Sequence, residues 1–351
     1  MMWWWLAQAV AGIHVVVEGE TVESILKAAG APAMAAEVRQ DNGLSPGVQP
    51  PVGAILRLPA ELPGGDCQPS YLWFHTGEDG VITFTDGVQR DLVDWMPLLR
   101  GTEVCSNSGY ATLRIAERVG SGAYDDVTLL PNTCLVVRES EADDTGARTS
   151  LLSLRQGSLR IPEMAAGRGM VIVETAAGIT LGRTGGFRVA VEEGATGGAP
   201  DATRTEAVDG DVLTLAQGSQ VAVPEGFGNR VREGDAPGVP VPLAPRPTPN
   251  SPRGELVVPD FVWRPSEGVL SYVVEFSSTS DFRDLLLSRA AVADEVRALP
   301  RGDLSWLPGW FSLPVTQGTV FWHVVGVDRP GFLGLPSEPF RVQLTQPPPA
   351  P

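Results

Sequence analysis

The sequence predicts a multidomain, mainly β protein that begins with a small strand-helix-helix-strand unit. Helical periodicity is confined to the first part of the chain, before Asn42. Beyond it, short apolar stretches are divided at close intervals by glycine (40 residues) and proline (31 residues), as in β structure with tight turns. A proline-rich run near residue 245 separates two strand-rich regions. The length of 351 residues allows roughly two or three domains.

Residues 1–9 are predicted to be the remnant of a secretory signal. They are apolar and end in Ala7-Gln8-Ala9, which is typical of a signal cleaved after Ala9. An apolar anchor is the alternative. No later run approaches the roughly 18 apolar residues of a membrane helix, so we expect an exported protein without a membrane span.

Residues 10–60 are predicted to form the strand-helix-helix-strand unit. Thr21 is a suitable N-cap for a helix with apolar residues at helical spacing, and Gly30-Ala31-Pro32 ends that helix. Pro32 suits the first turn of a second helix, and Asn42-Gly43 suits its left-handed C-terminal stop. The stretch from Gly53 to Pro59 supplies the returning strand.

The segment from His14 to Pro59 resembles a lysin motif (LysM), a module that binds peptidoglycan or chitin. The resemblance implies a shallow groove for the N-acetyl sugars of peptidoglycan between two loops. Departures from the family pattern are His14 in place of an aromatic residue and Glu20 in place of aspartate. Some such modules serve only as packing or protein-contact units. Carried over, the glycan-binding residues are Gly19, Glu20, Thr21, Val22, Asn42, Gly43, Leu44 and Ser45.

Residues 71–243 are predicted to form an all-β domain. Short stretches such as Val81-Ile82-Thr83-Phe84 and Phe187-Arg188-Val189-Ala190-Val191 alternate with period two. Their order and glycine spacing, from Leu99-x-Gly101 to Val223-Pro224-Glu225-Gly226-Phe227-Gly228, resemble the periplasmic domain of the ferric-citrate regulator (FecR) family. The resemblance implies stacked short strands, and in that family the domain carries a signal across the envelope. We expect two polar insertions, residues 139–148 and 193–205, to be solvated loops.

Three cysteines allow one disulfide and one spare thiol. Cys105 and Cys134 lie in the same predicted domain and are the pair to test, with buried free thiols as the alternative. Cys67 is the third, and no two cysteines have the spacing of a metal site.

Residues 244–254 are predicted to be a stiff proline-rich linker, because repeated proline favours an extended chain. Residues 255–345 follow, and their segments from Phe261-Val262-Trp263 to Phe321-Trp322-His323 resemble a fibronectin type III or immunoglobulin-like sandwich. We expect Trp263 and Trp322 in its core. Local packing is the expectation for Trp306, Trp310 and Phe311, with sugar stacking as the alternative. Residues 346–351 are predicted to be a disordered tail.

Charge and motif content exclude several functions. The formal net charge of -16 and the absence of a basic run argue against nucleic acid. The chain lacks the metal, nucleophile-elbow and phosphate-loop motifs of common enzymes, and two Asp pairs lack the alternating ligands of a calcium loop. We therefore expect no catalytic residue, no metal and no cofactor.

The sequence favours a non-catalytic protein of the periplasm or cell envelope that binds peptidoglycan through its first module. Its two β domains then serve as a scaffold for other envelope proteins. Two alternatives belong to other classes: a FecR-type envelope signalling component, and a cell-wall hydrolase whose paired carboxylates meet only in three dimensions.

Overall fold

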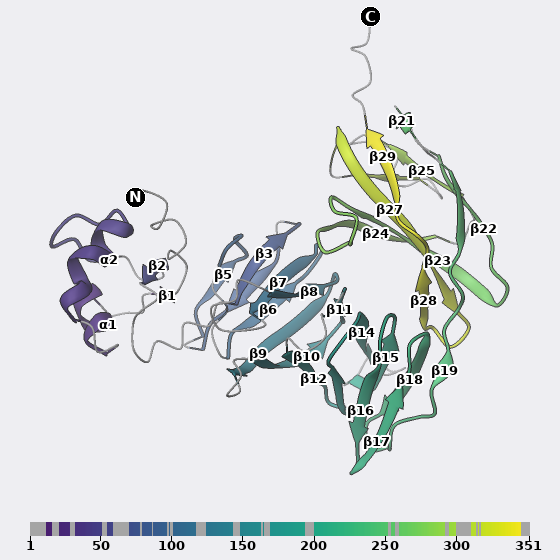
Figure 1. Ribbon diagram of the computed structural model, residues 1–351, viewed down its shortest axis with the longest axis horizontal. Coiled ribbons are helices and arrows are strands. Elements are labelled where there is room, and N and C mark those ends of the chain that lie inside the picture. Colours follow the sequence, from purple (N-terminus) through teal and green to yellow (C-terminus); the bar gives the residue numbers. More distant parts are fainter. Residues whose placement is uncertain are drawn as a thin grey trace, which may run out of the picture.

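In the computed structural model the chain forms a small helical unit, a double-sheet β domain and a C-terminal β domain (Figure 1). Within the described part of the chain, no helix has the length and apolar character needed to cross a membrane. The signal-like residues 1–9 and the tail 346–351 lie outside it. The structure describes residues 12–15, 21–28, 32–50, 55–58, 70–77, 79–85, 87–96, 98, 101–116, 124–142, 148–162, 164, 169–193, 200–251, 254–256, 260–291, 295–299, 310–313, 315 and 317–344.

The N-terminal unit has the order strand, helix, short 3-10 helix, helix, strand. Strands β1 and β2 pair antiparallel, with Gly12 opposite Leu58. Its small core consists of Val22, Ile25, Leu26, Val38 and Leu56. The elements are β1 (Gly12–Val15), α1 (Val22–Ala28), η1 (Pro32–Met34), α2 (Ala35–Asp41) and β2 (Ile55–Leu58).

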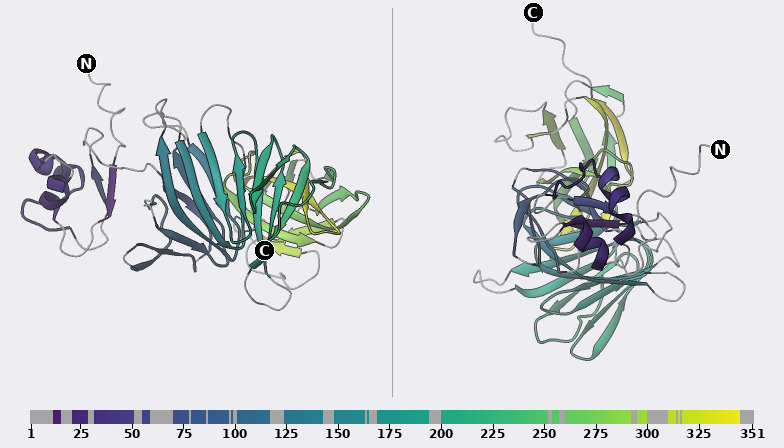
Figure 2. Two further views of the ribbon diagram at one scale, coloured as in Figure 1. Left: turned by 90° about the horizontal axis from the view of Figure 1, so that it is seen from below. Right: turned by 90° about the vertical axis from the view of Figure 1, so that its left-hand side faces the viewer.

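The middle domain consists of two sheets packed face to face, seen edge-on in Figure 2. The nine-stranded sheet contains, in spatial order, β17 (Ser219–Val223), β16 (Val212–Ala216), β13 (Ile179–Gly182), β12 (Gly169–Glu174), β10 (Arg148–Gln156), β9 (Thr133–Ala142), β6 (Glu103–Ser106), β4 (Val81–Thr83) and β5 (Gln89–Asp91). The eight-stranded sheet contains β19 (Val241–Pro242), β18 (Phe227–Arg232), β15 (Pro200–Ala207), β14 (Phe187–Glu193), β11 (Ser158–Ile161), β8 (Tyr124–Leu129), β7 (Ala111–Ala116) and β3 (Tyr71–His75).

The strand order in both sheets follows the order of the chain, apart from the β4–β5 hairpin at one edge. The chain crosses repeatedly from one sheet to the other and adds strands at the same advancing edge. Nearly all pairs are antiparallel, and β10 with β12 is a parallel exception. The arrangement agrees with the stacked short strands that the FecR resemblance implies.

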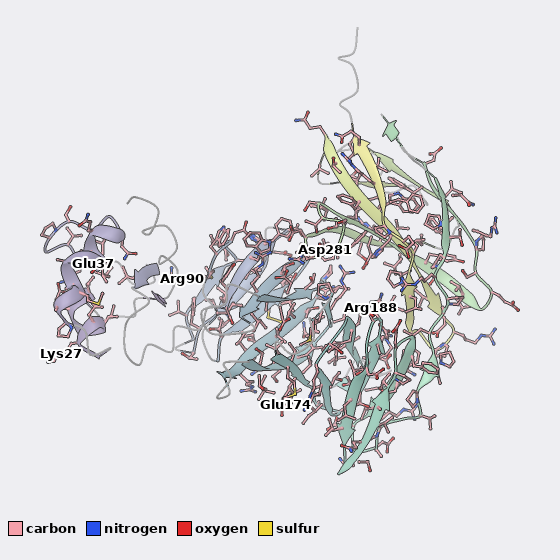
Figure 3. All side chains as sticks on the ribbon, in the orientation of Figure 1. Lys27, Glu37, Arg90, Glu174, Arg188 and Asp281 are labelled. Atoms are coloured by element: carbon pink, nitrogen blue, oxygen red, sulfur yellow. A yellow bond between two sulfur atoms is a disulfide. The ribbon has the colours of Figure 1, made fainter. Side chains whose placement is uncertain are left out.

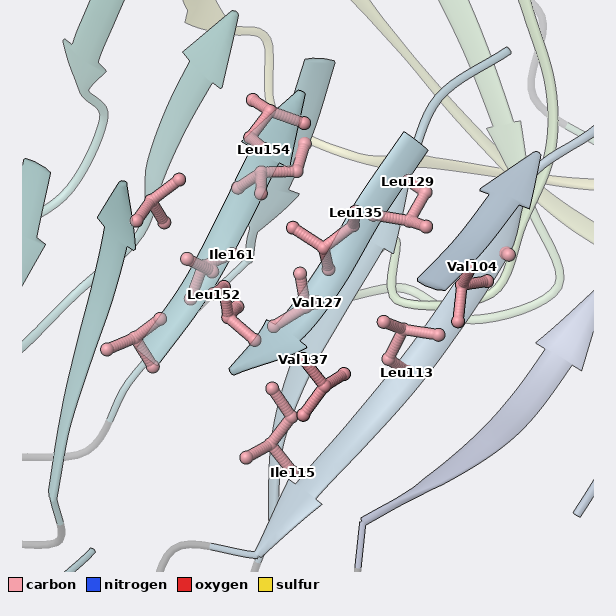
Figure 4. Packing of buried hydrophobic residues seen from close by; sticks show 14 of the residues in the cluster. Val104, Leu113, Ile115, Val127, Leu129, Leu135, Val137, Leu152, Leu154 and Ile161 are labelled. Atoms are coloured by element: carbon pink, nitrogen blue, oxygen red, sulfur yellow. The ribbon is translucent and has the colours of Figure 1, made fainter. Parts of the chain in front are cut away.

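Period-two alternation builds the core between the two sheets (Figure 4). In β11, Leu159 and Ile161 are buried in this core while Arg160 points to the opposite face. In β14, Phe187 and Val189 are buried in the same core, while Arg188 between them points to the opposite face. Apolar residues at alternate positions of both sheets therefore hold the domain together.

The insertion predicted as a loop at residues 193–205 is a strand in its second half, β15. Its inward-facing residues are threonines rather than aliphatic residues. Thr203 and Thr205 are buried and form hydroxyl hydrogen bonds of 2.6 and 2.7 Å to Thr175 and Thr180 of the other sheet. The polar composition thus reflects hydrogen bonds between the sheets, and the loop prediction is wrong there. Strands β9 and β10 likewise extend into the predicted loop at residues 139–148.

The C-terminal domain contains two further sheets and a separate aromatic core. Phe261, Phe276 and Trp322 meet edge to face or at steep angles, and Trp263 lies against Tyr272. Trp263 and Trp322 are buried, as predicted. One sheet contains β20 (Thr248–Ser251), β22 (Asp260–Arg264), β25 (Glu295–Leu299) and β26 (Trp310–Ser312); the other contains β21 (Gly254–Leu256), β29 (Phe340–Leu344), β27 (Gly318–Asp328), β23 (Val269–Ser277) and β24 (Leu285–Ala291), with β28 (Leu333–Pro336) paired to β27.

The proline-rich segment is packed against the C-terminal domain rather than standing free as a spacer. Ala244 is buried, and its carbonyl accepts a hydrogen bond from Leu335 N at 3.0 Å. Residues 248–251 form β20, which pairs with β22. Proline does favour the extended backbone seen here, but edge strands tolerate it, so the segment joins a sheet edge.

Candidate functional site

Two of the loop residues assigned to glycan binding, Thr21 and Val22, have structural roles at the start of α1. Thr21 Oγ1 accepts a hydrogen bond from Ser24 N at 3.0 Å, and Thr21 N donates to Ser24 Oγ at 2.8 Å. Thr21 is therefore the predicted N-cap. The Val22 side chain is fully buried in the small core. Gly19 and Glu20 lie outside the described residues.

The second predicted loop begins at the end of α2. Asn42 Nδ2 donates a 2.7 Å hydrogen bond to Val38 O, and Leu44 packs against the small core. Gly43 adopts a φ of 65°, the left-handed conformation expected at a helix C-terminus. Gly43 and Ser45 are exposed. Only part of the predicted set is therefore available to a ligand.

Arg39 braces these two segments, although the sequence prediction did not include it. Its guanidinium binds both carboxylate oxygens of Glu23, at 2.8 and 3.0 Å, and donates to Val48 O at 2.6 Å. The hydrogen bond from Arg39 lowers the pKa of Glu23. Because Glu23 lies in the first turn of α1 and Val48 follows α2, Arg39 connects the start of α1 to the segment after α2.

A disulfide joins Cys105 of β6 to Cys134 of β9, the pair singled out from the sequence. The two residues are directly opposite each other in the antiparallel ladder. Disulfides persist in oxidising compartments, so this one indicates an exported protein.

The most extensive polar site lies where the eight-stranded sheet meets the C-terminal domain. Side chains on its outer face, from β3 to β18, bond to that domain. Trp73 Nε1 donates to Asp284 at 3.1 Å, Thr112 Oγ1 to Arg283 O at 2.8 Å, and Arg230 to Pro330 O at 2.7 Å. The C-terminal domain therefore covers the sheet across most of its width.

An arginine, a glutamate and a histidine form the centre of this junction. Arg160 Nη1 lies 2.6 Å from Glu275 Oε2, and its Nη2 donates to Phe282 O at 3.0 Å. His323 Nε2 lies 2.6 Å from the same glutamate oxygen, and its ring stacks on Phe282 at 3.6 Å between centroids. All three charged or polar side chains are at least 90% buried. Residues 115 positions apart in the chain thus share one buried cluster.

Burial and pairing have opposite effects on these groups. Burial raises the pKa of Glu275, but Arg160 and the hydrogen bond from His323 outweigh it and hold that pKa well below its usual value. Burial lowers the pKa of His323 despite the opposing effect of Glu275. At neutral pH the imidazole is therefore uncharged, and its Nε2–H donates to an ionised Glu275.

Arg188 forms a second buried connection beside the first. Its Nη1 donates to the carbonyls of Leu333 and Gly334 at 3.1 and 3.0 Å. Glu206 lies 3.5 Å from Arg188 and accepts a hydrogen bond from Leu333 N at 2.9 Å. Burial lowers the pKa of Arg188. Figure 3 labels Arg188 and Asp281, one from each domain, near this junction.

A pocket of about 190 Å³ opens at the junction, lined by Arg160, Arg188, Arg246, Ser280, His323 and Ser337 among others. The Ser337 hydroxyl bonds to the backbone of Val324 and Glu338 rather than to His323. The His323 ring, which lines the pocket, is hydrogen-bonded to Glu275. Among the described residues, no group of three or more His, Cys, Asp or Glu side chains is placed to hold a metal.

Sequence reasoning missed this junction and one exposed aromatic residue, Trp95. Arg160 and Arg188 each stand between two apolar residues of a strand, a pattern typical of a solvent-facing side chain. The neighbouring sequence therefore gives no indication that a distant domain covers them. Trp306, considered for sugar stacking, lies outside the described residues. Trp310 and Phe311 belong to β26, but their side chains lie outside the described part.

A scan against protein-family models finds no match. A search of curated proteins likewise finds none. The chain is similar to the solved structure of a candidate anti-sigma factor from Parabacteroides distasonis, with 15% identity and a TM-score of 0.31, over 40% of this chain and 59% of that one. It is also similar to the extracellular domain of a candidate one-component system from B. thetaiotaomicron, with 8% identity and a TM-score of 0.20, over 73% of this chain and 37% of that one. The chain thus spans less than two thirds of either protein. Similarity at this level does not extend to function.

Proposed function

We propose that this chain is a non-catalytic component of the cell envelope, located in the periplasm, and that it works as a signalling component of the FecR type. In this proposal the two β domains form one rigid platform that contacts a protein partner. The observation that carries it is the buried junction of Arg160, Glu275 and His323.

The physical argument concerns the relative position of the domains. A buried charge without its partner is strongly unfavourable, so paired groups on two domains disfavour their separation. Apolar contacts supplement the ion pairs, since Tyr110 packs with Phe282 and Leu285 across the junction. When a partner protein binds one β domain, the other β domain therefore lies in a fixed position relative to it.

The test is a transcriptome comparison in the native host. We expect deletion of the gene to change the genes of one sigma-factor regulon together, and the wild-type gene to restore them. The Arg160→Ala variant should restore them poorly, whereas Arg264→Ala, at an exposed site in the same protein, should behave as wild type. Unchanged transcription of every such regulon in the deletion strain would rule out the signalling role.

A second proposal, peptidoglycan binding by the N-terminal unit as a lysin motif, is supported by the Arg39 brace. Arg39 connects Glu23, which follows Thr21 and Val22, to Val48, which follows Ser45. Because Thr21, Val22 and Asn42 serve the local fold, the exposed Ser45 is the better position to perturb. Full-length protein should pellet with peptidoglycan sacculi, Ser45→Trp should pellet less, and the exposed Glu37→Ala should pellet like wild type. The assignment would be contradicted if Ser45→Trp and Glu37→Ala pelleted equally. It would also be contradicted if the wild-type protein did not pellet.

A further inference from the structure

Trp95 is an exposed aromatic residue held in an unfavourable backbone conformation. Its exposed fraction is 57% and its φ is 69°, in the left-handed region that bulky side chains rarely adopt. Backbone hydrogen bonds hold this turn against β3: Trp95 N donates to Leu72 O at 2.6 Å, and Leu72 N donates to Met96 O at 2.8 Å. Strained residues of this kind concentrate at functional sites.

The Trp95 ring is supported from beneath by other rings. It stacks on Tyr71 at 5.3 Å between centroids with an interplanar angle of 17°, and meets Trp73 at 4.6 Å and 80°. Trp73 lies at an irregularity in the β3–β7 pairing, and the Arg114 guanidinium lies 3.6 Å from its ring centroid. Although Tyr71 and Trp73 both contact it, Trp95 stays 57% exposed. The exposed part of the ring is thus held in place before any ligand arrives.

Polar groups lie next to Trp95 in the chain. His75 Nδ1 lies 2.6 Å from Asp94 Oδ1, and both side chains are partly exposed. The Asp94 carboxylate can accept further hydrogen bonds at its second oxygen. Val93, two residues before Trp95, is 55% exposed. The surface therefore combines a small apolar area with hydrogen-bonding groups at its edge.

We propose that Trp95 is the stacking platform of a carbohydrate site that binds a neutral β-linked oligosaccharide. A pyranose ring with equatorial substituents presents a CH-bearing face to an indole and hydroxyl groups at its rim, and these hydroxyls donate to Asp94. The apolar area is one ring and one valine, whereas a stable protein interface buries about 800 Å² per partner. A neutral ligand is also not repelled by the Asp94 carboxylate next to Trp95 in the chain. This inference is independent of the proposed signalling function and of the N-terminal unit.

The test is calorimetric titration of the full-length protein with cellohexaose, xylohexaose and chitohexaose. The first two lack N-acetyl groups, so their binding does not report on the lysin-motif proposal. We expect wild type to bind at least one of these two, and Trp95→Ala to weaken binding about tenfold or more, as for rings that stack on nucleobases. Trp95→Asn should have the same effect, because asparagine tolerates the left-handed backbone and preserves the turn. Leu270→Ala, at a side chain 60% exposed in the other β domain, should bind as wild type.

Three results would overturn the proposal. One is that wild type binds neither cellohexaose nor xylohexaose. A second is that Trp95→Ala and Trp95→Asn, shown by circular dichroism to be folded, bind as tightly as wild type. The third is that the wild type binds no sugar but forms a dimer that the Trp95 variants do not form, as judged from the molar mass in light scattering. That result would assign the ring to a contact between copies of the chain.

Discussion

Replacement of Arg160 by alanine tests whether the buried junction holds the two β domains together. The substitution removes a 2.6 Å ion pair to Glu275 and a 3.0 Å hydrogen bond to Phe282 O. Glu275, whose side chain is 6% exposed, then keeps its charge and its hydrogen bond to His323, but loses its ion pair. Removing one partner of a buried ion pair destabilises proteins by about 3–5 kcal/mol, a large share of the about 5–15 kcal/mol that separates folded from unfolded states.

The assay is equilibrium unfolding in urea, followed by circular dichroism and tryptophan fluorescence. We expect Arg160→Ala to unfold at lower urea and the two β domains to separate into distinct transitions. Arg264→Ala is the matched control, since an exposed substitution typically changes the free energy of unfolding by no more than about 0.5 kcal/mol. The double variant Arg160→Met with Glu275→Gln should recover most of the loss, because neither buried charge remains and the introduced amide keeps an acceptor for His323.

Two results would refute this reasoning. A loss below about 1 kcal/mol in Arg160→Ala would show that the pair is solvated rather than buried. A double variant as unstable as the single one would show that lost packing of the arginine stem, and not an unpaired carboxylate, is the source of the effect.

Acidification below pH 6.5 should destabilise the protein, because unfolded His323 takes up a proton near its usual pKa of 6.5 while the folded imidazole, with its lowered pKa, does not. The free energy of unfolding should therefore fall less steeply between pH 6.5 and 5 in His323→Gln, and equal slopes would contradict this. Replacing Cys105 and Cys134 by serine should lower the free energy of unfolding by about 3–4 kcal/mol, from closure of a loop with a sequence separation of 29, and equal urea midpoints of variant and wild type would speak against it. Thr21→Ala should destabilise the N-terminal unit by about 1 kcal/mol through loss of the Ser24 N–H acceptor, whereas Thr21→Ser should not; helical circular dichroism on heating decides between them.

Local sequence rules account well for the strands and turns. Glycine-rich stretches between apolar strands are typical of turns, and Gly182-x-x-Gly185-Gly186 connects β13 to β14. Gly185 has a φ of 71°, and a Cβ there would overlap the backbone carbonyl of Asp209, so glycine is required. Alternation also identified the core residues of β14. These features depend on near neighbours in the chain, which the sequence displays directly.

The functional surfaces depend on contacts that the sequence does not display. Arg160 and Arg188 occupy positions that alternation assigns to the outside of the sheet, and only the later domain makes them buried. Thr203 and Thr205 were assigned to a solvated loop because they are polar. Their hydrogen-bond partners, Thr175 and Thr180, are not close to them in the sequence. Trp95 has no local pattern of a binding site, since its backbone conformation and its stacking on Tyr71 arise from folding. Sequence reasoning therefore predicts elements better than it predicts which faces are covered.

The chain-ordered sheets of the middle domain have a consequence for folding during export. Each strand pairs with strands close to it in sequence, so a chain that leaves a translocation channel N-terminus first can pair its strands as they emerge. The advancing sheet edge is unprotected until later strands arrive, and such edges favour pairing with other chains. The C-terminal domain follows the middle domain in the chain and covers the outer face of its eight-stranded sheet. Until that domain arrives, Arg160 and Arg188 lie on an uncovered sheet face, so its folding completes the burial of both side chains.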